Sequence, residues 1–312
     1  MGLKVSIIGA GGRVGSTAAY ALQLGGVARE VALIDVYMAD QVAGEALDLV
    51  HGAAFNAPQK FTAGGYELLE GADVIVITSG LRRKPDEERL ALVNRNVDMF
   101  KGIVAEIKKQ KIGKDTIILV VSNPVDVLTH LTIKEAGLPE GQVIGLGTVL
   151  DTSRFRALLA EEFDVAATDI AANLYGEHGD TMFPAWSSAT IQGAPLAAIP
   201  GFTKEKGDAI YERARTSGAE VIRRKGGAGS AVGISIKTVV EAILLDKKIV
   251  LPVSTLQTGL NGVANVTLSV PTIVGRAGAV KQLKANLSES EQALLVKSAD
   301  HLKETLKLIG LA

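Results

Sequence analysis

Residues 3–15 read LKVSIIGAGGRVG, a short β-branched run that passes directly into a cluster of glycines. The helix-forming run STAAYALQL follows at residues 16–24. A glycine turn between a strand and a helix lets a phosphate group approach the N-terminus of the helix, where unpaired N–H groups and the helix dipole favour negative charge. The same string also occurs as a tight turn in other α/β proteins, so the glycines alone leave both interpretations open.

Asp35 favours the phosphate-binding interpretation. It ends the next predicted strand, about twenty residues after the glycines, where a carboxylate can accept hydrogen bonds from both ribose hydroxyls. Its charge disfavours a ribose 2′-phosphate, so the sequence predicts NAD rather than NADP. Gly9, Gly11 and Gly15 have one residue more than the GxGxxG fingerprint allows, whereas Gly9, Gly12 and Gly15 form a GxxGxxG pattern. The sequence therefore does not decide which glycines contact the phosphates. The predicted cofactor-binding residues are Gly9, Gly11, Gly12, Arg13, Val14, Gly15 and Asp35.

Composition limits the class of protein. The chain has 312 residues, 47% of them hydrophobic and 21% charged, with a net charge of −1, so we expect a globular protein of two domains without the basic surface of a nucleic-acid binder. It has no cysteine, which excludes disulfides and cysteine-ligated metal sites, and we expect no metal. Without a signal-peptide pattern or a membrane-spanning apolar stretch, we expect a cytoplasmic protein with no membrane partner.

The first half of the chain alternates β-branched runs with helical patterns. Uninterrupted apolar runs such as VIVIT and TIILVV are typical of strands buried on both faces, which indicates a parallel sheet covered by helices. We therefore predict a doubly wound parallel α/β domain over residues 1–144. Its strands are predicted at residues 3–8, 31–35, 74–78, 116–121 and 142–146.

The second half follows a different pattern, and we assign residues 145–312 to a second domain. The pair Asn261-Gly262 predicts a hairpin turn, and Ser288 with Glu291 predicts a capping box at the start of the last helix. The predicted helices lie near residues 151–163, 204–225 and 288–309, and the predicted strands near 170–174, 182–191, 248–258 and 263–270.

Of the four histidines, His178 has the sequence surroundings most typical of a functional residue. It lies in the run GEHGD at residues 176–180, where glycines on both sides let a small molecule approach the ring. The other three, His51, His130 and His301, look like ordinary helix residues. A lone histidine is more often structural than catalytic, so His178 needs partners before a role can be assigned.

Separated motifs give the chain a resemblance to a known family. They are the glycine turn with Asp35, SNPVD at residues 122–126, LDTSRFR at residues 150–156, and GEHGD. With these motifs in this order, the chain resembles the lactate/malate dehydrogenase family over essentially its whole length. The resemblance implies a Rossmann-type NAD-binding domain, then a mixed α/β catalytic domain, and hydride transfer between NAD and a 2-hydroxy acid.

The resemblance also implies roles for single residues. His178 matches the family's proton shuttle, and Asp151 matches the aspartate that bonds the far ring nitrogen and stabilises the imidazolium. Arg154 matches the arginine that grips the substrate carboxylate with its planar fork. Asn123 matches the asparagine beside the substrate hydroxyl and the nicotinamide. Without the resemblance, Asp151 and Arg154 would be interpreted as an N-cap aspartate and an exposed helix arginine.

Residues 80–89, GLRRKPDEER, resemble the family's active-site loop that closes over the substrate. Arg89 matches the catalytic arginine that polarises the substrate carbonyl. Arg83 occupies the family's specificity position, where an arginine pairs with the second carboxylate of a dicarboxylate substrate. Lactate has no second carboxylate, so it would leave the arginine buried without a partner, which costs several kcal/mol of binding free energy. We therefore expect malate and oxaloacetate as substrates, a step of the tricarboxylic acid cycle. A solvated charge run is the alternative for this stretch.

Other functions remain as alternatives. The nearest is an L-lactate or broader 2-hydroxyacid dehydrogenase. An NAD-dependent glycosidase would need a metal site that includes cysteine, and a non-catalytic dinucleotide sensor would not need His178, Asp151 or Arg154. The resemblance implies a homodimer or homotetramer. The predicted helix at 40–54 has an apolar face that either forms a subunit interface or packs within the subunit. That face consists of Ala43, Leu47, Val50 and Ala54.

Overall fold

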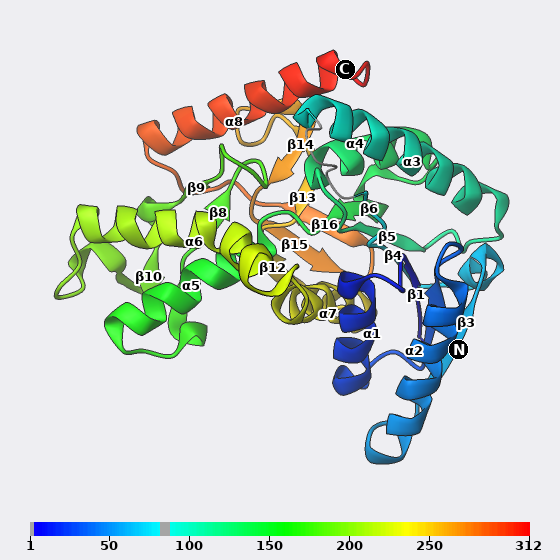
Figure 1. The fold of residues 1–312 in the computed structure, drawn as a ribbon. Coiled ribbons are helices and arrows are strands. Elements are labelled where there is room, and N and C mark those ends of the chain that lie inside the picture. The colour runs from blue at the N-terminus through cyan, green and yellow to red at the C-terminus, as the bar shows by residue number, and fades with distance from the viewer. Residues whose placement is uncertain (1–2, 82–87) are drawn as a thin grey trace.

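The computed structural model describes residues 3–81 and 88–312. An eight-stranded sheet runs through the molecule in the order β14-β13-β6-β5-β4-β1-β2-β3 (Figure 1). The six strands from β6 to β3 are parallel, and the order of the chain reverses between β1 and β4. This confirms the predicted doubly wound sheet. The parallel strands are β1 (Lys4–Ile8), β2 (Glu30–Ile34), β3 (Lys60–Gly64), β4 (Val74–Ile77), β5 (Ile117–Val120) and β6 (Val143–Gly145).

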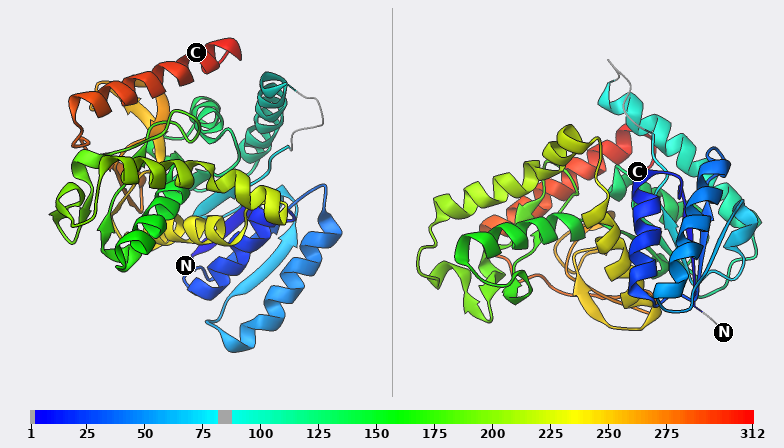
Figure 2. Two further views of the ribbon diagram at one scale, coloured as in Figure 1. Left: turned by 60° about the vertical axis from the view of Figure 1, so that its left-hand side comes forward. Right: turned by 60° about the horizontal axis from the view of Figure 1, so that its bottom comes forward.

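Alternate residues of the central strands build two separate cores, because successive side chains of a strand point to opposite faces. In β4, Ile75 and Ile77 belong to one apolar cluster, and Val74 and Val76 to the other. The first cluster includes α3 (Arg89–Lys109), α4 (Val125–Glu135) and α8 (Glu289–Leu308). The second includes α1 (Arg13–Gly25), α2 (Ala39–Gly52) and α7 (Ser230–Leu244). Helices thus cover both faces of the sheet (Figure 2).

The second half of the chain adds strands to the same sheet. Strand β13 (Ser254–Thr258) pairs antiparallel with both β6 and β14 (Ala264–Ser269). Helices α5 (Val149–Phe163) and α6 (Lys204–Lys225) pack together to one side of the parallel strands (Figure 1). The predicted boundary between residues 144 and 145 falls inside β6 and stays a prediction.

Small sheets make up the rest of the second half. The strands predicted at 170–174 and 182–191 are short separate pieces in the structure, and the family's mixed α/β domain is confirmed. The strands are β7 (Ile170–Ala171), β8 (Leu174–Tyr175), β9 (Phe183–Pro184), β10 (Thr190–Ile191), β11 (Ala194–Pro195), β12 (Ile249–Leu251), β15 (Thr272–Gly275) and β16 (Gly278–Gln282).

Two local predictions can be compared with the structure directly. The hairpin is confirmed as β13–β14, but its turn is longer than two residues, with Gly259 N–H donating to the Val263 carbonyl at 3.0 Å. The capping box is confirmed: Ser288 Oγ accepts from Glu291 N–H, and the Glu291 carboxylate accepts from Ser288 N–H at 2.8 Å. Across the described ranges, no helix is long and apolar enough to cross a membrane.

Candidate active site

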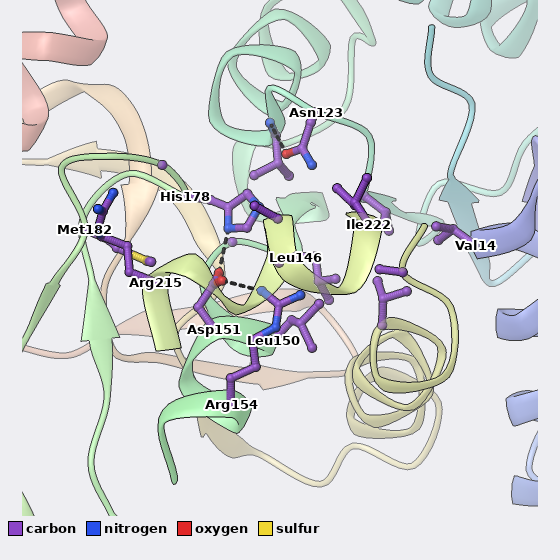
Figure 3. A pocket seen from close by; sticks show the side chains of 18 of the residues that line it. Val14, Asn123, Leu146, Leu150, Asp151, Arg154, His178, Met182, Arg215 and Ile222 are labelled. Atoms are coloured by element: carbon purple, nitrogen blue, oxygen red, sulfur yellow. Dashed lines mark hydrogen bonds and ion pairs between the residues drawn. The ribbon is translucent and has the colours of Figure 1, made fainter. Parts of the chain in front are cut away.

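A cavity of about 380 Å³ opens beyond the carboxyl ends of the parallel strands. In an open α/β sheet this is where ligands bind, because the loops that follow neighbouring strands meet there. The cavity takes Asn123 from the loop after β5, Gly147 from the loop after β6, and Val14 from the start of α1. Helix α6 and the loop that carries His178 form the far wall (Figure 3).

His178 and Asp151 form a hydrogen-bonded pair in this cavity. The distance from His178 Nδ1 to Asp151 Oδ2 is 2.6 Å. Asp151 is buried in the first turn of α5, so its carboxylate is fixed by the helix. An acceptor on Nδ1 places the proton there in the neutral ring and leaves Nε2 for a substrate. The structure thus brings the two residues together as the resemblance implies.

Arg154 lies one helical turn after Asp151, and its Nη1 donates to Asp151 Oδ1 at 2.9 Å. The side chain is 17% exposed and lines the cavity. A guanidinium has five N–H donors, so this bond leaves capacity to hold a carboxylate. Figure 3 shows Asp151 between Arg154 and His178, bonded to both.

Opposing effects act on the pKa of His178. Burial lowers it, because the imidazolium loses solvation, but the carboxylates of Asp151 and Asp126 raise it, and the pKa lies above its usual value. Burial also raises the pKa of Asp151, whereas His178 and Arg154 lower it, and the result is a pKa below the usual range. The pair therefore favours a protonated ring beside an ionised carboxylate.

Asn123 also lines the cavity. Its Oδ1 accepts from Val125 N–H at 3.3 Å, at the start of α4. The amide NH2 takes no part in that bond and is a suitable donor for a substrate oxygen or a carboxamide.

The glycine turn forms a close-packed cradle. A Cβ at Gly9 would lie 2.6 Å from Ser79 N, and one at Gly15 would lie 2.4 Å from the Gly9 carbonyl oxygen. Gly9 also has a φ of +86°, a conformation that favours glycine. A Cβ at Gly12 would lie 3.3 Å from the Gly9 carbonyl oxygen, so this position is less crowded than Gly9 and Gly15.

The residues around this turn fit a dinucleotide. Helix α1 begins at Arg13, and its N-cap Gly12 provides no side chain to cap the first N–H groups, which suits a phosphate. Asp35 directly follows β2, and a Cβ at Gly11 would lie 3.2 Å from its Oδ2. The Arg13 side chain runs beside Gly227, where a Cβ would lie 3.3 Å from Arg13 Cδ. Val14 lines the cavity itself.

Two predicted residues cannot be placed at the site. Arg83 lies outside the described residues, with most of the predicted active-site loop. Arg89 is the first residue of α3, but its side chain also lies outside the described part of the chain. Their roles stay predictions.

The structure adds residues that the sequence did not single out. Arg215 of α6 and Met182 line the cavity. Arg215 pairs with Glu212 at 2.6 Å and Asp180 at 3.5 Å. Its spacing on α6 is that of an ordinary surface arginine, so the sequence carried no signal for it. The Asp126 carboxylate accepts a hydrogen bond from the main-chain N–H of His178. Asp126 belongs to the SNPVD motif, but no role was assigned to it from the sequence.

Comparison with known proteins agrees with this architecture. Residues 3–145 match the lactate/malate dehydrogenase NAD binding domain, and residues 148–310 match the alpha/beta C-terminal domain of the same family. The chain is 43% identical to an L-lactate dehydrogenase of Clostridium botulinum (strain Okra / Type B1), with 97% of this chain and 96% of that protein covered. It is 42% identical to L-lactate dehydrogenase 1 of Clostridium acetobutylicum, with 98% of each covered.

Solved structures give the same result. A minor L-lactate dehydrogenase from Enterococcus mundtii, in a ligand-bound form, superposes with a TM-score of 0.94 at 35% identity, over 98% of each chain. A lactate dehydrogenase from a Medee basin deep-sea metagenome library superposes with a TM-score of 0.95 at 33% identity, over 99% of this chain and 100% of that one.

These relatives correct the expected substrate. The predicted malate dehydrogenase activity and the place in the tricarboxylic acid cycle are wrong, because the relatives that match over the full chain are L-lactate dehydrogenases. The prediction failed because it gave one charged position, Arg83, more weight than the rest of the chain. The predicted NAD cofactor is confirmed by the family of the first domain.

Proposed function

The chain belongs to the lactate/malate dehydrogenase family, and on that premise we propose that it is an NAD-dependent L-lactate dehydrogenase that interconverts L-lactate and pyruvate. The 43% identity to an L-lactate dehydrogenase over 97% of the chain supports the substrate. The His178–Asp151 pair, at 2.6 Å in a cavity that also holds Arg154, supports the chemistry. A proton donor and a carboxylate-binding cation are what a 2-keto acid needs on the protein side.

The glycine turn and Asp35 would hold the nicotinamide cofactor, which when bound would supply the hydride for reduction and accept it in oxidation. Arg154 holds the substrate carboxylate, which orients the carbonyl group. In reduction, the imidazolium of His178 gives its Nε2 proton to the carbonyl oxygen and becomes neutral. In oxidation, the neutral ring takes the hydroxyl proton of lactate. Asp151 stabilises the imidazolium form through Nδ1.

A broader 2-hydroxyacid dehydrogenase is the second candidate. Small residues, Gly218, Ala219 and Ala228, form part of the cavity wall. Such a wall leaves room for a substrate side chain larger than a methyl group. This candidate shares the chemistry of the first and differs only in the substrates accepted.

The test is NADH oxidation by the purified protein, followed optically, with pyruvate, 2-oxobutyrate, a longer 2-keto acid and oxaloacetate at matched concentrations. We expect pyruvate to have the highest kcat/KM. Comparable values for the longer keto acids would favour the second candidate.

A higher kcat/KM for oxaloacetate would contradict lactate as the substrate but leave the dehydrogenase chemistry intact. His178→Asn is the control for that chemistry: it should abolish turnover and preserve NADH affinity, because the ring lies outside the cofactor cradle. Turnover of none of the acids would contradict the enzyme proposal altogether.

We also propose that the chain forms a homo-oligomer, as a dimer or a tetramer. In α2, Val42, Ala46 and Leu49 are buried within the subunit. Leu47 and Val50 lie on the exposed face, and Ala43 and Ala54 are exposed as well. The internal core therefore does not use the face predicted from the sequence.

A further inference from the structure

A second carboxylate is buried beneath the loop that carries His178. Asp126 lies in the first turn of α4 and is 2% exposed. Its Oδ2 accepts from the main-chain N–H of His178 at 2.7 Å, and its Oδ1 accepts from Ser254 Oγ at 2.5 Å. Thr267 Oγ1 donates to its main-chain carbonyl at 2.6 Å. The carboxylate thus joins α4, β13 and the His178 loop through uncharged donors.

Hydrogen bonding alone does not require a carboxylate at this position. Burial raises the pKa of Asp126 to about 6, although the bonds from Ser254 and His178 N–H oppose the rise. Above that pH the group is ionised in the interior, which costs free energy of folding. An asparagine of the same size would accept from His178 N–H through Oδ1 and donate to Ser254 Oγ through Nδ2. What the aspartate adds is its charge.

We propose that Asp126 is a positioning residue whose buried negative charge, bonded to the main chain of His178, works with Asp151 to stabilise the protonated ring. Its catalytic consequence depends on the function proposed above. Its effect on the ring does not, because that is a property of the protein without substrate or cofactor.

The charges around His178 differ in how far they are neutralised. The Asp151 carboxylate forms an ion pair with Arg154, and the positive charge of Arg154 opposes protonation of the His178 ring. Asp126 is bonded to uncharged donors and carries no such cation in its hydrogen bonds. A buried charge bonded only to neutral donors acts over a longer range than an ion pair.

Several other charged groups face the ring from the described parts of the chain. Arg215 approaches from α6, and Glu177 and Asp180 belong to the loop itself. His301 of α8 lies 3.8 Å from Glu177 Oε1. None of these changes when Asp126 is replaced, so a shift of the His178 titration in such a variant reports on Asp126.

The experiment is an NMR titration of the histidine ring carbons in the intact protein. The chain has four histidines, and the signal of His178 is identified by its loss in His178→Asn. In Asp126→Asn we expect the pKa of His178 to fall by roughly half a unit to one unit, the direction that follows from removing an opposite charge. Asp115→Asn is the matched control, because it removes an equal charge from an exposed position in the loop before β5.

The same variant has a kinetic signature. Reduction needs the protonated ring, so the decline of kcat/KM with rising pH should begin at a pH lower by the same amount. NADH affinity should be unchanged, and the midpoint of thermal unfolding at pH 8 should be unchanged or higher, because a buried charge has gone. An unshifted ring titration in a folded Asp126→Asn protein would leave Asp126 a structural role only.

Ser254→Ala covers the case in which Asp126→Asn does not fold. Loss of the hydroxyl donor raises the pKa of Asp126, so the carboxyl is protonated over more of the neutral range and the pKa of His178 falls by a smaller amount. No fall would contradict the proposal. If the ring shifts as expected but no keto acid is reduced, the inference about Asp126 stands and the proposed function fails.

Discussion

At the residue scale, the pKa of His178 depends on carboxylates from two other elements of the fold. The ring alone titrates near pH 6.5. Burial pulls its pKa down, and the carboxylates of Asp151 and Asp126 more than restore it. The pKa of His178 is therefore raised because α5 holds the Asp151 carboxylate against Nδ1 and α4 holds the Asp126 carboxylate against the main-chain N–H.

Asp151→Asn should reduce kcat for pyruvate reduction on the order of a hundredfold or more, because the imidazolium loses its partner and the ring its orientation. A raised pKa keeps the ring protonated up to that pH, and reduction slows as the pH rises through it. Without Asp151 the pKa falls, so this decline should begin at lower pH. The measurement is kcat and kcat/KM against pH, with NADH saturating. A lower rate with an unchanged pH profile would show that Asp151 acts only by orienting the ring.

The three residues that do the predicted chemistry were identified from the sequence because His178, Asp151 and Arg154 lie in separate motifs of one family. Asp126 escaped because an acidic residue in the first turn of a helix is common and is stabilised there by the helix dipole. Only the fold brings β13 and the His178 loop to its carboxylate. The substrate was wrongly predicted because a single residue, Arg83, was given too much weight.

At the scale of single elements, the strand-turn-helix unit from β1 to α1 depends on glycine in a way that helix propensity does not reveal. Gly15 is inside a helix, where alanine is normally preferred by up to about 1 kcal/mol. A Cβ there would collide with the main chain of the turn.

Gly15→Ala should therefore weaken NADH binding by at least about tenfold and lower the midpoint of thermal unfolding, because the turn must open to admit the methyl group. The matched control is Gly102→Ala in α3, where a Cβ would meet nothing within 4 Å. That variant should raise the free energy of unfolding by about 0.5–1 kcal/mol and leave NADH affinity unchanged. Fluorescence titration with NADH and thermal unfolding measure both. Equal behaviour of the two variants would refute the steric argument.

The elements that the sequence predicted are those with strong patterns. Strands β4 and β5 are buried throughout, and their uninterrupted apolar runs predicted them correctly. Strand β3 was missed because Phe61 is its one buried residue, and it lies at the edge of the sheet. Helix α7 was missed because it is apolar on most sides and rich in β-branched residues, which blurs a helical period.

At the scale of the whole molecule, the exposed face of α2 predicts assembly. Leu47→Glu places a charge on that face and should reduce the assembly by at least one step, from tetramer to dimer or from dimer to monomer. Leu308→Glu on α8 is the control, because that leucine is 71% exposed on another helix. Sedimentation or light scattering gives the mass. An unchanged mass for Leu47→Glu would show that α2 lies outside the interface.

The pairing of β13 with β6 has a consequence for synthesis on the ribosome. Ser254 of β13 pairs with Gly145 of β6, so one edge of β6 stays unpaired until β13 has been synthesised. Until then the nascent chain presents an unpaired strand edge, which is the kind of surface that recruits other chains. We therefore expect aggregation to be favoured for as long as β13 has not been synthesised and paired with β6.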